Sequence, residues 1–178
     1  KTTKRQNNNK NNKIEKMTIA TFETSMGTFK TELFTDKMPL TCGNFIDLVE
    51  RKFYDGLHFH RVVPDYMVQF GCPHSKDYSH EDIGKGSGPP STSFKGCDGK
   101  EYERDEFGNI EDEIGKRISN DIATLSMANS GEPETGGSQI FINVKHNKHL
   151  NWYDGSSESA HVVFGKVVEG YEEVVKKI

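Results

Sequence analysis

Alternating apolar and polar residues near the start of the chain predict a β-hairpin. Two strand-like runs fill residues 18–34, on either side of Ser25-Met26-Gly27, and both are rich in β-branched and aromatic side chains. Gly27 can adopt the positive φ that a tight turn requires. We therefore expect two antiparallel strands here.

A helical pattern follows the hairpin. Pro39 suits the first turn of a helix, because its missing N–H would find no partner there in any case. An apolar stripe with the spacing i, i+3, i+4 and i+7 then runs through Cys42, Phe45, Ile46 and Val49. This helix is expected to cover an open end of a sheet, with Cys42 as a small core residue and not as a reactive thiol.

Residues 59–69, Phe-His-Arg-Val-Val-Pro-Asp-Tyr-Met-Val-Gln, place one arginine among apolar and aromatic residues, with no carboxylate directly beside it. A strand over residues 57–63 would turn alternate side chains to one face. On that face it would carry Leu57, Phe59, Arg61 and Val63. We therefore expect a permanent cation on an apolar face.

The chain is then predicted to turn back. Pro64 ends the first strand, because proline cannot donate a ladder hydrogen bond. A second short strand over residues 66–70 brings Met67 and Gln69 back toward Arg61. The predicted product is a shallow apolar pocket with a guanidinium at its edge.

The rest of the chain predicts more strands and a second helix. Apolar runs indicate strands at 122–127, 139–144 and 162–168 and a helix at 171–177. In the middle one of these strands Phe141 shares a face with Gln139, so it is expected to look into the pocket. Residues 72–120 are rich in Gly and charges and predict surface loop with a short strand at 92–94. The whole pattern predicts a closed β-rich sheet plugged by two short helices.

Composition adds a tail to this picture. At 178 residues, 33% of them hydrophobic, the chain is expected to close a single core. Residues 1–16 hold six Lys or Arg, one Glu, five Asn and a single apolar residue, Ile14, too little to offset the entropy of ordering. We predict a disordered basic arm over residues 1–16 and one folded domain over residues 17–178.

Net charge argues against bulk nucleic-acid binding by the folded domain. The chain carries −4, and six Lys or Arg less one Glu give the arm +5, which leaves −9 on the remainder. For the arm itself, a basic address or an RNA contact stays open beside the simpler interpretation of a solvated extension.

Cysteine usage and hydropathy bear on the compartment. The three cysteines, Cys42, Cys72 and Cys97, cannot all pair internally, and His74 and His80 do not complete a closed metal site with them. We expect a reducing compartment, the cytoplasm first and the nucleus second, and neither a metal nor a cofactor. No apolar run in the sequence is long enough to span a bilayer, so we expect no membrane association. Separately, we expect a monomer.

The stretch 59–69 resembles the signature of the cyclophilins, which are peptidyl-prolyl cis-trans isomerases: Phe-His-Arg, four variable positions, Phe-Met, one more position, Gln-Gly-Gly. Three later stretches are similar to the family's in the same order. They are Leu-Ser-Met-Ala-Asn-Ser-Gly at 125–131, Gly-Ser-Gln-Ile-Phe-Ile at 137–142 and His-Val-Val-Phe-Gly-Lys-Val at 161–167. With loop differences, the resemblance covers residues 18–178.

That resemblance implies a mainly β fold, a closed antiparallel barrel of eight strands capped by two α-helices. The sequence stops at Ile178, inside the predicted second helix, where the family adds a last strand that pairs with the first. We expect either a shortened chain or a barrel with an exposed edge, which is a liability for aggregation.

The resemblance further implies catalysis of rotation about X-Pro bonds in proteins, which assists folding or conformational switching. Rotation costs about 18–20 kcal/mol because twisting removes the amide resonance. The twisted imide nitrogen regains a localised lone pair, so a donor aimed at it favours the transition state. Arg61, always charged and planar, is the candidate catalytic residue, and the reaction needs no nucleophile, metal or cofactor.

Substrate-binding residues are also implied by the resemblance. The proline ring would be held by Tyr66, Met67, Phe141, Leu150 and His161. The groove beside it would be lined by Ala128, Asn129 and Gln139. Gln69 would orient Arg61 and bond the substrate, whereas His60 is assigned to packing and His58 to the opposite strand face. On the sequence alone, these side chains could instead be ordinary core residues: Met67, Phe141 and Leu150.

Two departures from the family concern this pocket. Tyr66 stands where the family usually has Phe, which adds a hydroxyl. His149, a further expected pocket residue, precedes Leu150 where many members have the Trp associated with tight cyclosporin binding. Peptide turnover is expected to persist and cyclosporin binding to weaken, unless Trp152, in an apparent insertion over residues 151–159, folds back as a substitute.

Two other functions remain as alternatives. The first is a non-catalytic proline-recognition or scaffold module in a larger assembly such as a spliceosome, which would need the apolar pocket but not Arg61. The second is a hydrolase that uses Ser126 or Ser138 with His161. It is the weaker of the two, because neither serine lies in a nucleophile turn.

Overall fold

A computed structural model describes residues 17–155 and 160–178, so the predicted arm and part of the expected insertion lie outside the described residues. The elements are the strands β1 Thr18–Thr24, β2 Gly27–Leu33, β3 Arg61–Val63, β4 Met67–Phe70, β5 Ser93–Lys95, β6 Glu101–Glu103, β7 Thr124–Met127, β8 Ile140–Asn143 and β9 Val163–Glu169, the helix α1 Pro39–Glu50, and the 3-10 turns η1 Pro73–Lys76, η2 Lys148–Leu150 and η3 Val175–Lys177. Over the described ranges, no helix combines the length and apolar character that crossing a bilayer demands.

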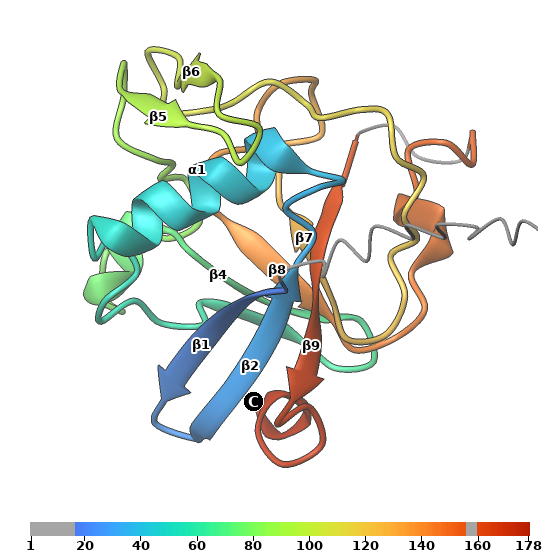
Figure 1. Cartoon of the computed structure of the whole chain (residues 1–178). Coiled ribbons are helices and arrows are strands. Elements are labelled where there is room, and N and C mark those ends of the chain that lie inside the picture. Colours follow the sequence, from blue (N-terminus) through green and yellow to red (C-terminus); the bar gives the residue numbers. More distant parts are fainter. Residues whose placement is uncertain (1–16, 156–159) are drawn as a thin grey trace, which may run out of the picture.

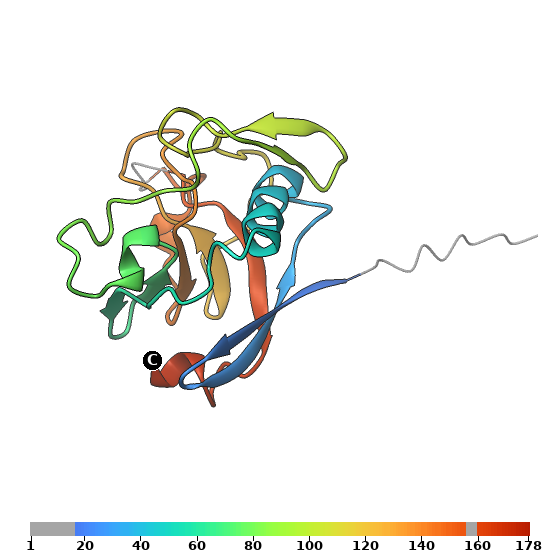
Figure 2. The same cartoon turned by 90° about the vertical axis from the view of Figure 1, so that its left-hand side faces the viewer.

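Seven strands form one strongly curled antiparallel sheet in the order β1-β2-β9-β7-β8-β4-β3, and β5 and β6 form a separate pair. The predicted hairpin forms, and it projects from the body of the domain with the C-terminus near its turn (Figures 1 and 2). Within the described ranges β1 and β3 are the two edges of the sheet. Over residues 17–155 and 160–178 the mainly β fold is therefore confirmed as a half-barrel with one α-helix, whereas the closed eight-stranded barrel is not confirmed.

Strand alternation divides the sheet into a core face and an outer face. Buried side chains of three central strands enter the hydrophobic core, and they are Val68, Phe70, Leu125, Met127, Ile140 and Ile142. Their neighbours in sequence, among them Met67 and Phe141, point to the other face and do not belong to that core. A slip of one residue in any of these three strands would turn its core side chains outward.

Aromatic rings join the hairpin to α1 and fill the space above the core face. Phe22 of β1 stacks on Phe29 of β2 with ring centroids 4.5 Å apart, and Phe22 lies 6.0 Å from Phe45 of α1. Phe45 also contacts Phe164 of β9, at 5.7 Å. The helix thus covers the curled sheet, as the sequence predicted (Figure 1).

The buried face of α1 differs in one residue from the predicted stripe. Cys42 and Phe45 are buried, but Val49 is 46% exposed and Leu48 is fully buried in its place. The buried arc is centred on Phe45 and Leu48, because the flank of the helix that carries Gly43 packs against the chain at Gly96 beside β5. Burial raises the pKa of the Cys42 thiol far above its usual range, so Cys42 is a core residue as expected.

The N-terminus of α1 is capped by a residue far away in sequence. Met38 at the N-cap supplies no side-chain hydrogen bond, and the first turn contains no acidic residue. Instead the Glu113 carboxylate accepts the backbone N–H groups of Leu40 at 2.9 Å and Thr41 at 2.8 Å. A negative charge at this end of a helix also opposes the helix dipole favourably.

The irregular segment 72–120 is fastened to α1 by a buried arginine. The Arg104 side chain is 0% exposed and donates to Asn44 Oδ1 at 2.8 Å and to Asp47 Oδ2 at 2.7 Å. It also donates to Thr92 and lies over the Phe94 ring. The β5–β6 pair, of which only the first strand was predicted, is held in place in this way.

One predicted strand is shorter than expected, and the predicted second α-helix does not form. Of the strand 57–63 only β3 forms, because His58 hydrogen-bonds Ser75 outside the sheet and Phe59 turns to the core beside Phe70, with ring centroids 5.2 Å apart. The second α-helix is not confirmed, since residues 171–177 form turns that end in η3. The segment is short, and Val174 has φ −124°, outside the helical region, so a costly helix nucleus does not form.

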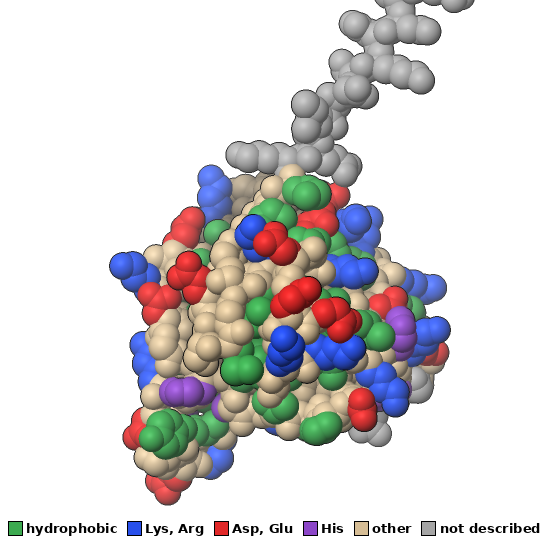
Figure 3. All heavy atoms as spheres, turned by 90° about the horizontal axis from the view of Figure 1, so that it is seen from below, with side chains coloured by type: hydrophobic (Ala, Val, Ile, Leu, Met, Phe, Trp, Pro, Cys, Tyr) green, Lys and Arg blue, Asp and Glu red, His purple; other side chains and the backbone are tan. Residues whose placement is uncertain are grey.

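Surface charge is mixed on the face seen from below. Lys and Arg side chains lie between Asp and Glu side chains there, with hydrophobic side chains among them (Figure 3). This face therefore offers no field of a single sign, the feature on which nucleic-acid binding by bulk charge depends.

The long-range cap gives a test of the fold. Glu113→Gln removes the negative charge and places an amide N–H₂ group against a backbone donor. We expect the free energy of unfolding to fall by about 0.5–2 kcal/mol, measured by urea titration. Glu111→Gln, at an exposed site in the same segment, serves as the control and should change stability little. Equal stability of the Glu113→Gln variant and the native chain would contradict the cap.

Candidate functional site

The candidate site is built on a lateral row of residues across three strands. Gln69 of β4 lies opposite Arg61 of β3 on one side and opposite Phe141 of β8 on the other. Residues directly opposite in antiparallel strands point to the same face. Met67, two residues before Gln69, joins them there. The sheet register alone therefore brings the arginine, an amide and two large apolar side chains together on the outer face.

These side chains surround a pocket of about 240 Å³. Its floor is apolar, since Met67 is 2% and Phe141 4% exposed, while Arg61 at the mouth is exposed. The pocket is lined by Arg61, Tyr66, Met67, Gln69, Ala128, Asn129, Ser130, Gly131, Phe141, Leu150 and His161. A pocket with an apolar floor and a guanidinium at its edge therefore forms where the sequence predicted one, although polar side chains such as Gln69, Asn129 and Ser130 contribute to its walls.

Arg61 makes polar contacts to uncharged groups. Its Nη1 donates to Gln69 Oε1 at 3.2 Å and lies 4.0 Å from the Met67 sulfur. Among the described residues no carboxylate forms an ion pair with it. The guanidinium keeps further N–H donors for a ligand.

A larger hollow of about 550 Å³ adjoins the pocket but does not contain Arg61. Gln139 faces this hollow together with Lys85 and Phe107, and the two cavities share Gln69 and Ala128–Ser130 as their common wall. Phe107 is 68% exposed at its rim. An extended chain bound in the pocket could therefore place a neighbouring residue in the hollow.

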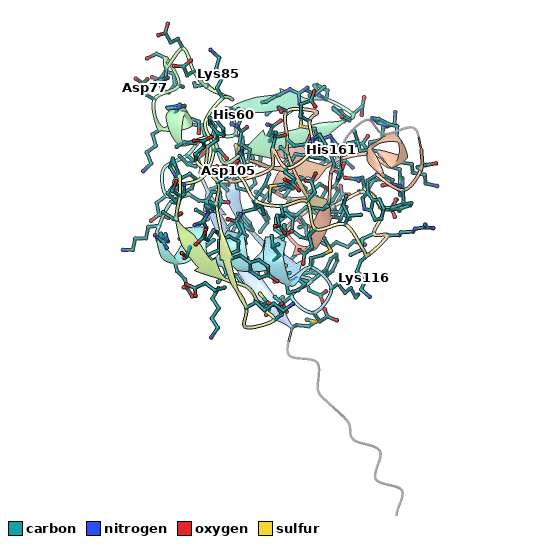
Figure 4. The ribbon with its side chains drawn as sticks, turned by 90° about the horizontal axis from the view of Figure 1, so that it is seen from above. His60, Asp77, Lys85, Asp105, Lys116 and His161 are labelled. Atoms are coloured by element: carbon teal, nitrogen blue, oxygen red, sulfur yellow. The ribbon has the colours of Figure 1, made fainter. Side chains whose placement is uncertain are left out.

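His161 closes the pocket on one side. Its Nδ1 lies 3.0 Å from the Met127 carbonyl oxygen, and its ring meets Phe141 edge-on with centroids 5.5 Å apart. Figure 4 shows His161 near the middle of the domain, away from the projecting loop that carries Asp77 and Lys85. Burial lowers the pKa of His161, against the opposing effects of the Met127 carbonyl and the Asp112 charge.

Sequence reasoning missed a buried asparagine network that supports the pocket. Asn143 Nδ2 donates to Thr124 Oγ1 at 2.9 Å and Ser126 Oγ at 3.0 Å. Asn147 Nδ2 donates to Asn143 Oδ1 and to the Tyr66 carbonyl. The sequence did contain one indication of this network, because the polar residue Asn143 lies in an otherwise apolar strand on the same face as Phe141.

The same network reaches two more walls of the site. Asn120 Nδ2 donates to the His161 carbonyl at 3.3 Å and to Asn151 Oδ1 at 3.1 Å. Asn120, Asn143, Asn147 and Asn151 are all at most 3% exposed. The loop asparagines carry no sequence signal, because only folding brings them to Asn143.

All but two of the predicted site residues line the pocket. Gln139 faces the larger hollow, and exposed His149 stacks on Tyr66 with centroids 5.9 Å apart. Trp152 packs against the core and Tyr153 and is not among the pocket's lining residues, so it does not replace the missing Trp. His60, assigned to packing, is half-buried and also hydrogen-bonds Gln139.

The hydrolase alternative is contradicted by the positions of its serines. Ser126 and Ser138 are each 0% exposed, and their hydroxyls donate to Asn120 Oδ1 and the Gly71 carbonyl. A nucleophile must reach its substrate and its base, and these hydroxyls reach neither. Within the described part of the chain, no three His, Cys, Asp or Glu side chains are placed to hold one metal ion.

Comparison with known proteins identifies the family. The family model described as cyclophilin type peptidyl-prolyl cis-trans isomerase/CLD matches residues 19–178. The chain therefore belongs to the cyclophilin-type peptidyl-prolyl cis-trans isomerases, and the prediction made from the four motifs is confirmed.

Relatives and solved structures agree with this assignment. Peptidyl-prolyl cis-trans isomerase-like 1 of Emericella nidulans is 38% identical over 154 residues, 86% of this chain and 76% of the relative. Peptidyl-prolyl cis-trans isomerase CYP18-2 of Arabidopsis thaliana is 38% identical over 159 residues, 89% of this chain and 78% of that protein.

Among solved structures, a cyclophilin type peptidyl-prolyl cis-trans isomerase of Cryptosporidium parvum is similar with a TM-score of 0.66 at 28% identity, covering 89% of this chain and 82% of that chain. A second structure of it, in the presence of the dipeptide Ala-Pro, has a TM-score of 0.64 at 29% identity and covers 87% and 80% of the two chains.

The lowered pKa of His161 predicts a pH dependence of stability. From the ordinary value of 6.5 downward, the unfolded chain takes up a proton on this residue before the folded protein does. The stability that His161 contributes is therefore complete above about pH 6.5 and falls as the pH drops below it. Urea unfolding between pH 5 and pH 7.5 measures this slope.

The slope should be smaller in His161→Gln, which cannot titrate there. The interpretation is wrong if His161→Gln and the native chain lose stability equally on acidification.

Proposed function

We propose that this protein catalyses cis-trans rotation about X-Pro peptide bonds, with Arg61 as the catalytic residue. The observation that carries the proposal is the Arg61 guanidinium at the mouth of an apolar pocket, 3.2 Å from Gln69 Oε1 and without a carboxylate partner among the described residues. The family membership and the names of the relatives support the same reaction.

The chemistry follows from the amide bond. Its barrier of about 18–20 kcal/mol arises from resonance that is lost on twisting. The twisted imide nitrogen becomes a hydrogen-bond acceptor, and a guanidinium N–H directed at it stabilises the transition state more than either ground state. Arg61, which forms no ion pair with a described carboxylate, is suited to this role, since a carboxylate partner would occupy its donors and neutralise its charge.

Each part of the site has a role in the proposal. Met67, Phe141, Leu150 and Tyr66 bury the proline ring, with His161 as the side wall. Ala128 and Asn129 form the wall along which the peptide backbone runs, and the larger hollow beyond it receives a residue that flanks the proline. The Cryptosporidium parvum relative was solved in the presence of Ala-Pro, which supports a proline-containing peptide as the ligand class here.

The scaffold alternative is not favoured. A pocket that only holds proline gains nothing from an unpaired cation at its mouth, and the relatives are named isomerases. An assembly that binds other surfaces of the domain remains compatible with catalysis.

We further propose how the sheet closes, in which compartment the protein works and in which oligomeric state. An eighth strand pairing with an edge of the sheet would close it into a barrel, and β1 and β3 both offer such an edge within the described ranges. The free thiols Cys42, Cys72 and Cys97 support a reducing compartment, with the cytoplasm as first choice. We also propose that the domain acts as a monomer.

Arg61→Ala tests the reaction. NMR exchange spectroscopy on an X-Pro peptide should show fast exchange with the native chain and a roughly 10- to 100-fold loss in the variant, because a hydrogen bond to a charged group contributes about 1.5–3 kcal/mol. Lys166→Ala removes a charge from an exposed site on β9 and should leave the rate unchanged. If the native chain binds the peptide without accelerating exchange, the scaffold alternative is correct.

Cyclosporin binding should be weak in the native chain and stronger in His149→Trp. The indole would add apolar area and an N–H donor beside Tyr66. We expect a gain in affinity of about tenfold, which corresponds to roughly 1.4 kcal/mol, measured by calorimetric titration. Trp152→Phe should leave the affinity unchanged, and a large loss in that variant would show that Trp152 does act as the substitute.

A further inference from the structure

His60 hydrogen-bonds Gln139, which in turn contacts Gln69 beside Arg61. It is half-buried, and its Nε2 lies 3.1 Å from Gln139 Oε1. Figure 4 shows His60 where the loop carrying Asp77 and Lys85 leaves the body of the domain. His60 is not among the residues that line the pocket, so it is not placed to touch a substrate there.

Gln139 is held by four hydrogen bonds at this point. Its Nε2 donates to the carbonyls of Gly84 and Gly86, both at 2.8 Å. Its Oε1 accepts from His60 Nε2 and from Gln69 Nε2, the latter at 2.9 Å. A flipped amide would turn two N–H groups toward two donors, so these partners fix its orientation.

That orientation is passed on to Arg61. Because Gln69 donates its Nε2 to Gln139, its Oε1 must face the other way, toward Arg61 Nη1. A flipped Gln69 would present N–H groups to the guanidinium and lose both contacts. The direction of the Arg61 side chain therefore depends on a series of hydrogen bonds that runs from the His60 imidazole through the side-chain amides of Gln139 and Gln69.

We propose that His60 is a positioning residue, which acts through Gln139 and Gln69 to hold the Arg61 guanidinium in its catalytic direction. The proposal rests on the proposed isomerase function for its effect on rate. Its structural part, the fixed direction of Arg61, stands apart from catalysis and can be measured apart from it.

A neutral imidazole suits this role. Burial lowers the pKa of His60, and the nearby Arg61 charge acts in the same direction, while the hydrogen bond to Gln139 opposes them. Among the described residues, the buried Nδ1 of His60 has no hydrogen-bond partner, so Nε2 is the nitrogen that needs the proton. An uncharged ring with its proton on Nε2 donates to Gln139 without placing a second cation beside Arg61.

Two substitutions separate the hydrogen bond from the volume of the ring. His60→Gln keeps an amide N–H donor near the position of Nε2, whereas His60→Leu fills similar space without a donor. We expect His60→Leu to lower kcat/KM for X-Pro exchange about three- to tenfold, the effect of one lost hydrogen bond, and His60→Gln to stay within about twofold of the native chain. His60→Met provides a second variant without a donor if His60→Leu does not fold.

A side-chain NMR signal tests positioning without reference to activity. In protein labelled with ¹⁵N-arginine, the Nε–H signal of Arg61 should shift or broaden in His60→Leu and keep its native position in His60→Gln. If the native chain shows no isomerase activity, the proposed function fails while this measurement still decides the positioning.

A double-mutant cycle tests the route through Gln139. In a Gln139→Met background, His60→Leu should cause no further loss of kcat/KM and no further change of the Arg61 signal. Equal losses in His60→Leu and His60→Gln, or full additivity with Gln139→Met, would overturn the proposal and leave His60 with a packing role.

Discussion

The candidate site depends on one constraint, the strict alternation of side chains in β4 and β8. Val68 and Ile142 belong to the core, whereas Met67, Gln69 and Phe141 point to the outer face and line the pocket. The same short strands therefore close the core and build the site. Burial of the core residues fixes the register, and the register fixes where Gln69 lies relative to Arg61.

Buried polar contacts convert that row into a pocket of defined shape. The asparagine network holds the Tyr66 carbonyl, the segment carrying Leu150 and the His161 carbonyl against β7 and β8. Buried amides are costly without partners, so a network with matched donors and acceptors favours one arrangement of these walls. Shape in this pocket is thus maintained by hydrogen bonds on one face of the sheet and by apolar packing on the other.

A few side chains hold the irregular segment 72–120 through long-range hydrogen bonds. Arg104 ties segment 72–120 to Asn44, and Asn44 in turn donates to the Gly137 carbonyl just before β8. Gly84 and Gly86 of the same segment accept hydrogen bonds from Gln139. Segment 72–120 is therefore joined to the chain just before β8 through Asn44 and to Gln139 directly. These contacts explain how a loop-rich segment forms one wall of the larger hollow.

The sequence by itself determined the hairpin, α1, the central strands, the family and almost all residues of the pocket, because periodicity and the motif around Arg61 are local properties of the chain. Only the tertiary structure decided that Phe59 turns to the core, that residues 171–177 form turns, that Glu113 caps α1 and that His60 contacts Gln139. The Glu113 cap joins residues 73 positions apart and the His60 contact joins residues 79 positions apart, and a strand or helix pattern carries no record of such partners until folding brings them into contact.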